Sequence, residues 1–192
     1  IEAKPDKVEY YFNLAALLGA QGKYEEAIKV YADLEEKYGQ MEEVAMQRQV
    51  IYRDQKKPEK ALEEVDQLIE FNPSEIRYYG MKAEILEEMG RTEEAKLLYN
   101  KMLEMEPEYG QIYFSLFRIY ENEGKTTQAR DYLLSAFESP GLGIDVKVNV
   151  LLNLMTNPGE SPELLFRLSE KLVEAHPNNA KAHAIQGDLY NN

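Results

Sequence analysis

Apolar residues recur at three- and four-residue steps along most of the chain, which is the pattern of amphipathic helices. The clearest example is residues 76–109, where two such stretches are separated by Gly90 and the second is closed by Pro107. Tyr79 and Leu86 lie on the apolar face of the first stretch. Glycine after the last apolar position is a common helix end, and proline cannot continue a helix. The pattern therefore predicts two helices joined by a tight turn.

The start of the second helix in this stretch has a recognisable cap. Thr92 offers a side-chain oxygen to the free N–H groups of the helix, so we expect it at the N-cap position. Glu93 and Glu94 follow and suit the positive end of the helix.

The same marks recur along the chain with a period of 34 residues. Two helices of this length cannot bury their own apolar faces, so consecutive pairs are expected to stack on one another. The turn residues are Gly22, Lys56, Gly90 and Gly124, the small residues that open each second helix are Ala27, Ala61, Ala95 and Ala129, and the closing breakers are Pro5, Gly39, Pro73, Pro107 and Gly141.

This pattern resembles the tetratricopeptide repeat family, which has an aromatic residue, Leu-Gly and Tyr, and later Ala, an aromatic and Pro. The resemblance implies an all-α fold, a right-handed superhelical α-solenoid of antiparallel helix pairs. Tyrosine replaces the usual tryptophan, in keeping with 14 Tyr and no Trp. The matching residues are Tyr11, Leu14, Ala15, Leu18, Ala27 and Tyr31 in one repeat, Tyr79, Ala83, Leu86, Ala95, Tyr99 and Pro107 in another, and Tyr113, Leu116, Tyr120 and Ala129 in a third.

The period divides residues 1–192 into a single array. Because the chain opens and closes in mid-repeat, we expect it to be part of a longer array, with any leader or catalytic domain outside it. The expected parts are 1–7, the end of a preceding repeat; four repeats at 8–41, 42–75, 76–109 and 110–143; an irregular fifth repeat at 144–179; and 180–192, the first helix of a truncated sixth.

Repeat 42–75 departs from the pattern, because Arg48 and Gln49 stand where leucine and a small residue are usual. This polar pair either weakens local packing, which we favour, or marks a surface where the helix meets something else.

The fifth repeat departs further. Its first helix, predicted at 145–156, is apolar nearly all round, so we expect it to be covered on more than one side and to be a place for an extra contact. Extra residues are expected near Gly143 and in the turn 157–162. Ser161 and Pro162 suit the start of the next helix, predicted at 163–175.

The charge balance narrows the classes of partner. Lys and Arg number 22 against 35 Asp and Glu, a net charge of −13, which argues against nucleic acid and anionic membrane surfaces. Much of the acidic charge comes as adjacent pairs, which we expect on solvated outer helix faces. These pairs are Glu25–Glu26, Glu35–Glu36, Glu63–Glu64 and Glu87–Glu88.

Composition excludes cysteine chemistry and does not determine the cellular compartment. The chain has no cysteine, hence no disulfide or thiolate. No apolar run approaches the roughly 20 residues that cross a bilayer, so we expect no membrane insertion. The sequence is compatible with the cytoplasm and with a bacterial periplasm or envelope. Because the chain begins in mid-repeat, a signal peptide that preceded it would not be part of this sequence.

No arrangement of residues predicts catalysis, so we expect a non-enzymatic protein without a cofactor. The two histidines, His176 and His183, are separated by the helix breaker Pro177 and do not predict a metal site.

The resemblance implies that the first helix of each repeat lines a concave groove that binds a partner peptide. The groove positions are the second, fifth, sixth, ninth and twelfth of a repeat, and Val50 and Arg53 are among them. The apolar members either face water as a binding surface or are partly covered by adjacent helices. The candidate ligand-binding residues are Phe12, Asn13, Met46, Gln47, Arg77, Met81, Glu84, Phe114, Arg118, Asn149 and Asn153.

The expected function is therefore that of a scaffold that binds a protein or peptide in this groove. The alternative is a regulatory or targeting arm of a larger enzyme or of a secretion or envelope assembly. Self-association through exposed repeat ends is a further possibility.

Overall fold

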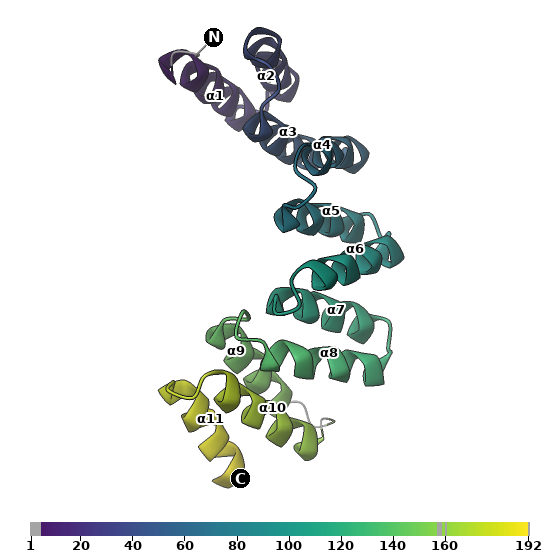
Figure 1. The fold of residues 1–192 in the computed structure, drawn as a ribbon, viewed down its shortest axis with the longest axis vertical. Coiled ribbons are helices and arrows are strands. Elements are labelled where there is room, and N and C mark those ends of the chain that lie inside the picture. Colours follow the sequence, from purple (N-terminus) through teal and green to yellow (C-terminus); the bar gives the residue numbers. More distant parts are fainter. Residues whose placement is uncertain (1–4, 157–158, 160, 192) are drawn as a thin grey trace. The chain divides into compact units, whose positions relative to one another are not determined.

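The computed structural model describes residues 5–156, 159 and 161–191, and within them the chain forms eleven α-helices (Figure 1). The chain divides into two compact units, Ile1–Leu98 and Tyr99–Asn192, and the boundary between them along the chain falls within α6. The helices are α1 (Pro5–Ala20), α2 (Tyr24–Tyr38), α3 (Glu42–Asp54), α4 (Pro58–Phe71), α5 (Ile76–Glu88), α6 (Thr92–Met105), α7 (Gly110–Asn122), α8 (Thr126–Glu138), α9 (Ile144–Met155), α10 (Pro162–Ala175) and α11 (Ala180–Asn191). The all-α prediction is confirmed.

The four predicted turn residues share one backbone conformation. Gly22, Gly90 and Gly124 have φ of 73°, 73° and 71°, and Lys56 has φ of 56°. This left-handed conformation ends a helix tightly and is easy for glycine, which lacks a Cβ atom. Lys56 is the one described non-glycine residue that adopts it, so the turn between α3 and α4 is strained.

Two predicted helix caps differ from the structure. Helix α6 begins at Thr92 itself, and the carbonyl of Arg91 accepts from the N–H groups of Glu94 and Ala95 at 3.1 and 3.2 Å. Thr92 is thus the first residue of the helix rather than its cap. Ser161 does occupy the N-cap position of α10, but its side chain makes no capping hydrogen bond.

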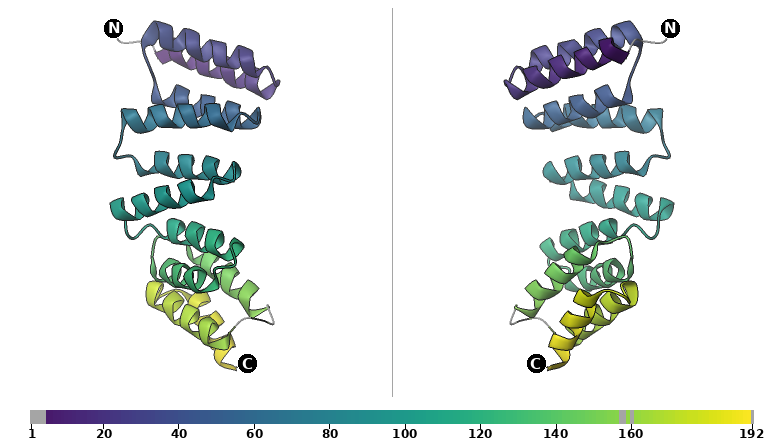
Figure 2. Two further views of the ribbon diagram at one scale, coloured as in Figure 1. Left: turned by 90° about the vertical axis from the view of Figure 1, so that its right-hand side faces the viewer. Right: turned by 90° about the vertical axis from the view of Figure 1, so that its left-hand side faces the viewer.

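In the first unit, α1 pairs with α2 and α3 pairs with α4, and the two hairpins are visible from both sides in Figure 2. Helix α2 also packs against α3, and α4 against α5. Ala27 and Ala61, the predicted small residues, have no exposed surface, so the paired helices approach closely there.

In the second unit, α7 pairs with α8, and α10 packs against α8, α9 and α11. Part of its core is a cluster built around Leu133, Phe137, Leu151 and Leu168. The expected end of a preceding repeat at 1–7 falls largely on residues 1–4, outside the described residues, while 5–7 open α1. The extra turn residues 157, 158 and 160 also lie outside them.

Candidate functional site

The predicted groove residues all lie on helices at the positions that a first helix of a repeat would occupy. Five helices carry them, three in the first unit and two in the second. They are Phe12 and Asn13 on α1, Met46 and Gln47 on α3, Arg77, Met81 and Glu84 on α5, Phe114 and Arg118 on α7, and Asn149 and Asn153 on α9.

The four apolar candidates are half-buried, each resting on the core of its own unit. The ring of Phe12 packs on Tyr31 with centroids 5.6 Å apart, and Phe114 packs on Phe117 at 5.6 Å. Met46 and Met81 both pack against the cluster of Ala45, Leu68 and Tyr78, so the structure brings these two candidates together. Each of the four side chains is held on one side and open on the other.

The seven polar candidates are exposed. Arg77 is engaged by its neighbour Glu75, which accepts from Nε at 2.9 Å and from Nη2 at 3.1 Å. The same carboxylate caps the start of α5 by accepting from the backbone N–H of Arg77, and these bonds lower the pKa of Glu75. The remaining polar candidates present their side chains to solvent on α1, α3, α5, α7 and α9.

A feature of the first unit extends the candidate site beyond these residues. Arg53 on α3 hydrogen-bonds Glu88 on α5, with Nε 3.3 Å from Oε2. An open hollow between the two helices is lined by Val50, Arg53, Asp54 and Glu88. Val50 and Arg53 occupy groove positions of their repeat, so the repeat register predicts these two residues from the sequence alone. Glu88 was expected on a solvated outer face, but it faces α3 instead.

Two other glutamates also depart from the expected outer face. Arg48 lies between Glu35 on α2 and Glu64 on α4, with nitrogen–oxygen distances of 2.6 and 2.9 Å. All three side chains are at most 15% exposed. Burial raises the pKa of the Glu64 carboxyl, and the nearby charge of Arg48 opposes that rise.

This ion bridge argues against the favoured interpretation, that Arg48 weakens local packing, and shows what the helix meets at this residue: Glu35 on α2 and Glu64 on α4. Arg48 joins α2, α3 and α4 through charge-assisted hydrogen bonds. Its neighbour Gln49 is 5% exposed, and among the described residues its Oε1 is a buried side-chain atom without a hydrogen-bond partner. The weaker local packing expected for this polar pair therefore applies to Gln49 and not to Arg48.

Helix α9 is covered less completely than its sequence suggests. Lys147 and Leu151 are its fully buried residues, whereas Val146 and Leu152 are 40% and 47% exposed. The expectation of cover on more than one side is therefore wrong for these two residues. Asn149 and Asn153 are exposed on the same helix.

The buried Lys147 ties α9 to the ends of two other helices. Its ammonium donates to the carbonyls of Phe137 and Ser139 at 2.9 and 2.7 Å and lies 3.2 Å from Nε2 of His176. Burial lowers the pKa of Lys147 to about 8, and burial together with the Lys147 charge lowers the pKa of His176. The other histidine, His183, is hydrogen-bonded to the carbonyl of Pro177 at 2.8 Å, so the two imidazoles have separate partners.

Comparison with known proteins places this geometry in a family. The tetratricopeptide repeat model matches residues 8–36 and 76–109, which are α1 with most of α2 and α5 with α6. Both matched stretches are tetratricopeptide repeats. Solved structures of tetratricopeptide repeat proteins share the fold of this chain. A tetratricopeptide repeat protein from Parabacteroides merdae superposes with a TM-score of 0.63 at 17% identity, covering 96% of this chain and 73% of that chain.

Two further relatives indicate how far the similarity extends. YrrB, described as a tetratricopeptide repeat protein with an unusual peptide-binding site, has a TM-score of 0.53 at 15% identity, covering 92% of this chain and 90% of that one. The uncharacterized protein y4yS of Sinorhizobium fredii is 35% identical over 74 residues, which are 38% of this chain and 41% of that protein. The aligned part thus spans about two fifths of that relative.

Tetratricopeptide repeats imply a general role. Tetratricopeptide repeats are scaffolds for protein–protein interaction, and proteins of the family are generally non-enzymatic. No helix within the described ranges combines the length and the apolar character needed to cross a bilayer.

Proposed function

We propose that this tetratricopeptide repeat protein binds a segment of a protein partner in a concave groove lined by the first helices of its repeats. In the first unit these helices are α1, α3 and α5, and in the second they are α7, α9 and α11. The partner segment lies across the open sides of the half-buried apolar residues and hydrogen-bonds their exposed polar neighbours.

One observation carries this proposal: half-buried apolar and exposed polar side chains recur together on the proposed groove helices. Phe12 stands beside Asn13, Met46 beside Gln47, and Phe114 one turn before Arg118. A side chain fixed by the core on one side loses little entropy when a partner covers the other side. Aromatic residues, methionine and arginine are also enriched at protein interfaces.

Two further observations support the proposal. The hollow at Val50, Arg53, Asp54 and Glu88 lies between two of the proposed groove helices, α3 and α5. The peptide-binding site named for YrrB belongs to a protein with the same fold, so the fold is compatible with this mode of binding.

The test is a pull-down from a lysate of the source organism with two baits, the parent chain and the double variant Phe114→Ala, Arg118→Ala. We expect a protein that the parent retains and the double variant loses, because truncation of the two groove residues removes both apolar and charged contacts. Circular dichroism and a melting curve must first show that both baits are folded alike.

A control variant separates the groove from the rest of the surface. Lys29 is exposed on α2, a second helix of its repeat, so Lys29→Ala is expected to retain the same protein as the parent. Equal retention by all three baits would overturn groove binding at α7. In the alternative function, a regulatory or targeting arm of a larger enzyme or of a secretion or envelope assembly, the chain binds through the same surface. The two functions differ only in whether the bound partner belongs to that assembly.

A further inference from the structure

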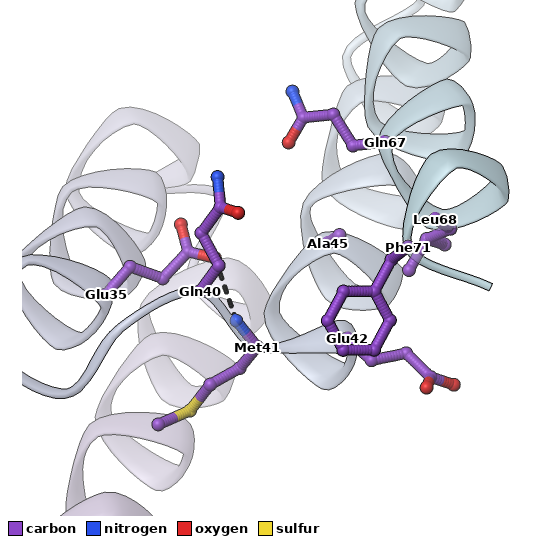
Figure 3. Close-up of a pocket in the computed structure, with 8 residues that line it drawn as sticks. All are labelled: Glu35, Gln40, Met41, Glu42, Ala45, Gln67, Leu68 and Phe71. Atoms are coloured by element: carbon purple, nitrogen blue, oxygen red, sulfur yellow. Dashed lines mark hydrogen bonds between the residues drawn. The ribbon is translucent and has the colours of Figure 1, made fainter.

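The first unit contains a small hollow whose lining includes none of the candidate groove residues. It has a volume of about 30 Å³, opens to solvent, and is formed where the ends of α2 and α4 meet the start of α3 (Figure 3). Phe71 stands at its edge and is 69% exposed. The lining residues are Glu35, Gln40, Met41, Glu42, Ala45, Gln67, Leu68 and Phe71.

The hollow occurs where the repeat lacks a tyrosine. At a period of 34 residues, the position of Ala45 is occupied by Tyr11, Tyr79 and Tyr113 in the other three regular repeats. Alanine ends at Cβ, so the space that a tyrosine ring takes up elsewhere stays open beside α3.

Tyr79 shows what this position normally holds. Its ring is 4% exposed, and its hydroxyl donates to the carbonyl of Pro73 at 2.8 Å. One period earlier, Pro73 corresponds to Gly39 and Tyr79 to Ala45. By the register of the repeat, the hollow therefore lies beside the position at which the other regular repeats carry a tyrosine.

The neighbouring Tyr78 does not take this place. It lies in the core cluster with Ala45 and Leu68, and the Glu42 carboxylate acts on its hydroxyl. Burial and that carboxylate raise the pKa of Tyr78 to about 12, so the phenol stays protonated. Tyr78 thus closes Ala45 from the α5 side and leaves the hollow open.

The charge of the lining selects the kind of partner. Of the eight lining side chains, all within the described part of the chain, Glu35 and Glu42 are carboxylates and none is basic. Glu35 is already paired with Arg48, so Glu42 is the carboxylate that attracts a basic group beside an occupant. The chain as a whole carries a net charge of −13. A basic group beside the occupant therefore gains electrostatic energy, and an acidic one is repelled.

We propose that this hollow binds a tyrosine side chain of a protein partner, from a segment in which the tyrosine is flanked by basic residues. The ring fills the space above Ala45 and packs on the exposed ring of Phe71. The flanking basic side chains lie near Glu42. This site goes beyond the proposed groove and does not depend on it.

The test uses a capped arginine–tyrosine–arginine tripeptide as probe and the full chain labelled with ¹³C at its methionine methyl groups. Met41 lines the hollow itself, whereas the groove candidates Met46 and Met81 contact its lining residues Ala45 and Leu68 from outside, so the Met41 methyl signal reports on the hollow. We expect the tripeptide to shift the Met41 signal saturably. An arginine–alanine–arginine tripeptide should bind roughly tenfold more weakly, because it lacks the ring that fills the hollow.

Three variants sharpen this test. Ala45→Tyr fills the hollow from within and should abolish the Met41 shift. Phe71→Ala should weaken binding severalfold, while its matched control Leu97→Ala, whose side chain is 70% exposed compared with 69% for Phe71, should leave binding unchanged. If Ala45→Tyr does not fold, the comparison of Phe71→Ala with Leu97→Ala decides the question.

Several results would overturn the proposal. They are an unshifted Met41 signal, equal binding of the alanine tripeptide, or a Met41 shift that persists in folded Ala45→Tyr. Shifts confined to Met46 and Met81 would assign the probe to the groove instead. A Met41 signal that moves on dilution of the protein alone would assign the hollow to a tyrosine of a second copy, and this too would overturn the proposal.

Discussion

Arg48 occupies a position at which the repeat pattern has leucine, and it is stabilised there by carboxylates from two other helices. Its guanidinium contacts Glu35 on α2 and Glu64 on α4. Nothing in the local sequence of α3 predicts this, because both partners are supplied by other helices. A polar residue at an apolar position signals an exception, but only the packed structure shows which group compensates it.

The ion bridge predicts a large cost for removing its cation. Arg48→Met leaves the carboxylate of Glu64 buried without its partner, and we expect a loss of about 3 kcal/mol in the free energy of unfolding. Urea denaturation near neutral pH measures this loss. The exposed Arg118→Met serves as control, with an expected change within about 0.5 kcal/mol. Adding Glu64→Gln to Arg48→Met should restore part of the stability, and no restoration would contradict the explanation.

Lys147 gives the stability of the protein a pH dependence of definite sign. Its pKa is about 8 in the folded protein against an ordinary value of 10.5. Between these values the unfolded chain binds a proton that the folded chain has released, so the free energy of unfolding rises with pH across that window. The groups that face Lys147 are the Phe137 and Ser139 carbonyls and His176.

The comparison of Lys147→Met with the parent isolates this effect. The rise in the free energy of unfolding between pH 8 and 10.5, measured by urea denaturation, should be present in the parent and absent in the variant. Tyr78 acts in the opposite sense at higher pH, because its pKa is raised from 10 to about 12 and the unfolded chain loses its proton first. The two chains should therefore both lose stability above pH 10.5, where the contribution of Lys147 no longer increases. A rise of equal size in the variant would show that another group is responsible.

At the scale of the helix pair, the tight turns are predictable from sequence and one of them is strained. The period of 34 residues places Gly22, Lys56, Gly90 and Gly124 in one register, and all four have positive φ. The turn depends on backbone conformation, which local residues determine. The exposure of Val146 and Leu152 on α9 is not predictable in this way, because it depends on which helices cover α9.

The strain in the α3–α4 turn predicts that replacing Lys56 with glycine stabilises the protein. Lys56→Gly relieves the left-handed conformation of a residue with a side chain, and we expect a gain of about 1 kcal/mol in the free energy of unfolding. The neighbouring Gln55 has φ of −73°, so Gln55→Gly should instead cost about 0.5 to 1 kcal/mol. Thermal melts of the two variants and the parent measure both signs. A loss of stability in Lys56→Gly would contradict the account of this turn.

At the scale of the whole molecule, sequence predicts the family and the all-α fold, and it proposes the binding positions without testing them. The half-burial of Phe12, Met46, Met81 and Phe114 required the structure, because periodicity alone leaves open whether these residues face water or are partly covered. The hollow at Ala45 also required it. An alanine in the place of a tyrosine is visible in the sequence, but neighbouring side chains decide whether the space is filled.

The central claim, that a partner lies along the first helices of the repeats, is tested most directly by photo-crosslinking in the source cell. A photo-reactive p-benzoylphenylalanine replaces Gln47 on α3 in one sample and Lys29 on α2 in another, both of which are exposed residues of the first unit. We expect a cross-linked partner protein from position 47 and none from position 29. Cross-linking from position 29 alone, or with equal yield from both, would contradict groove binding.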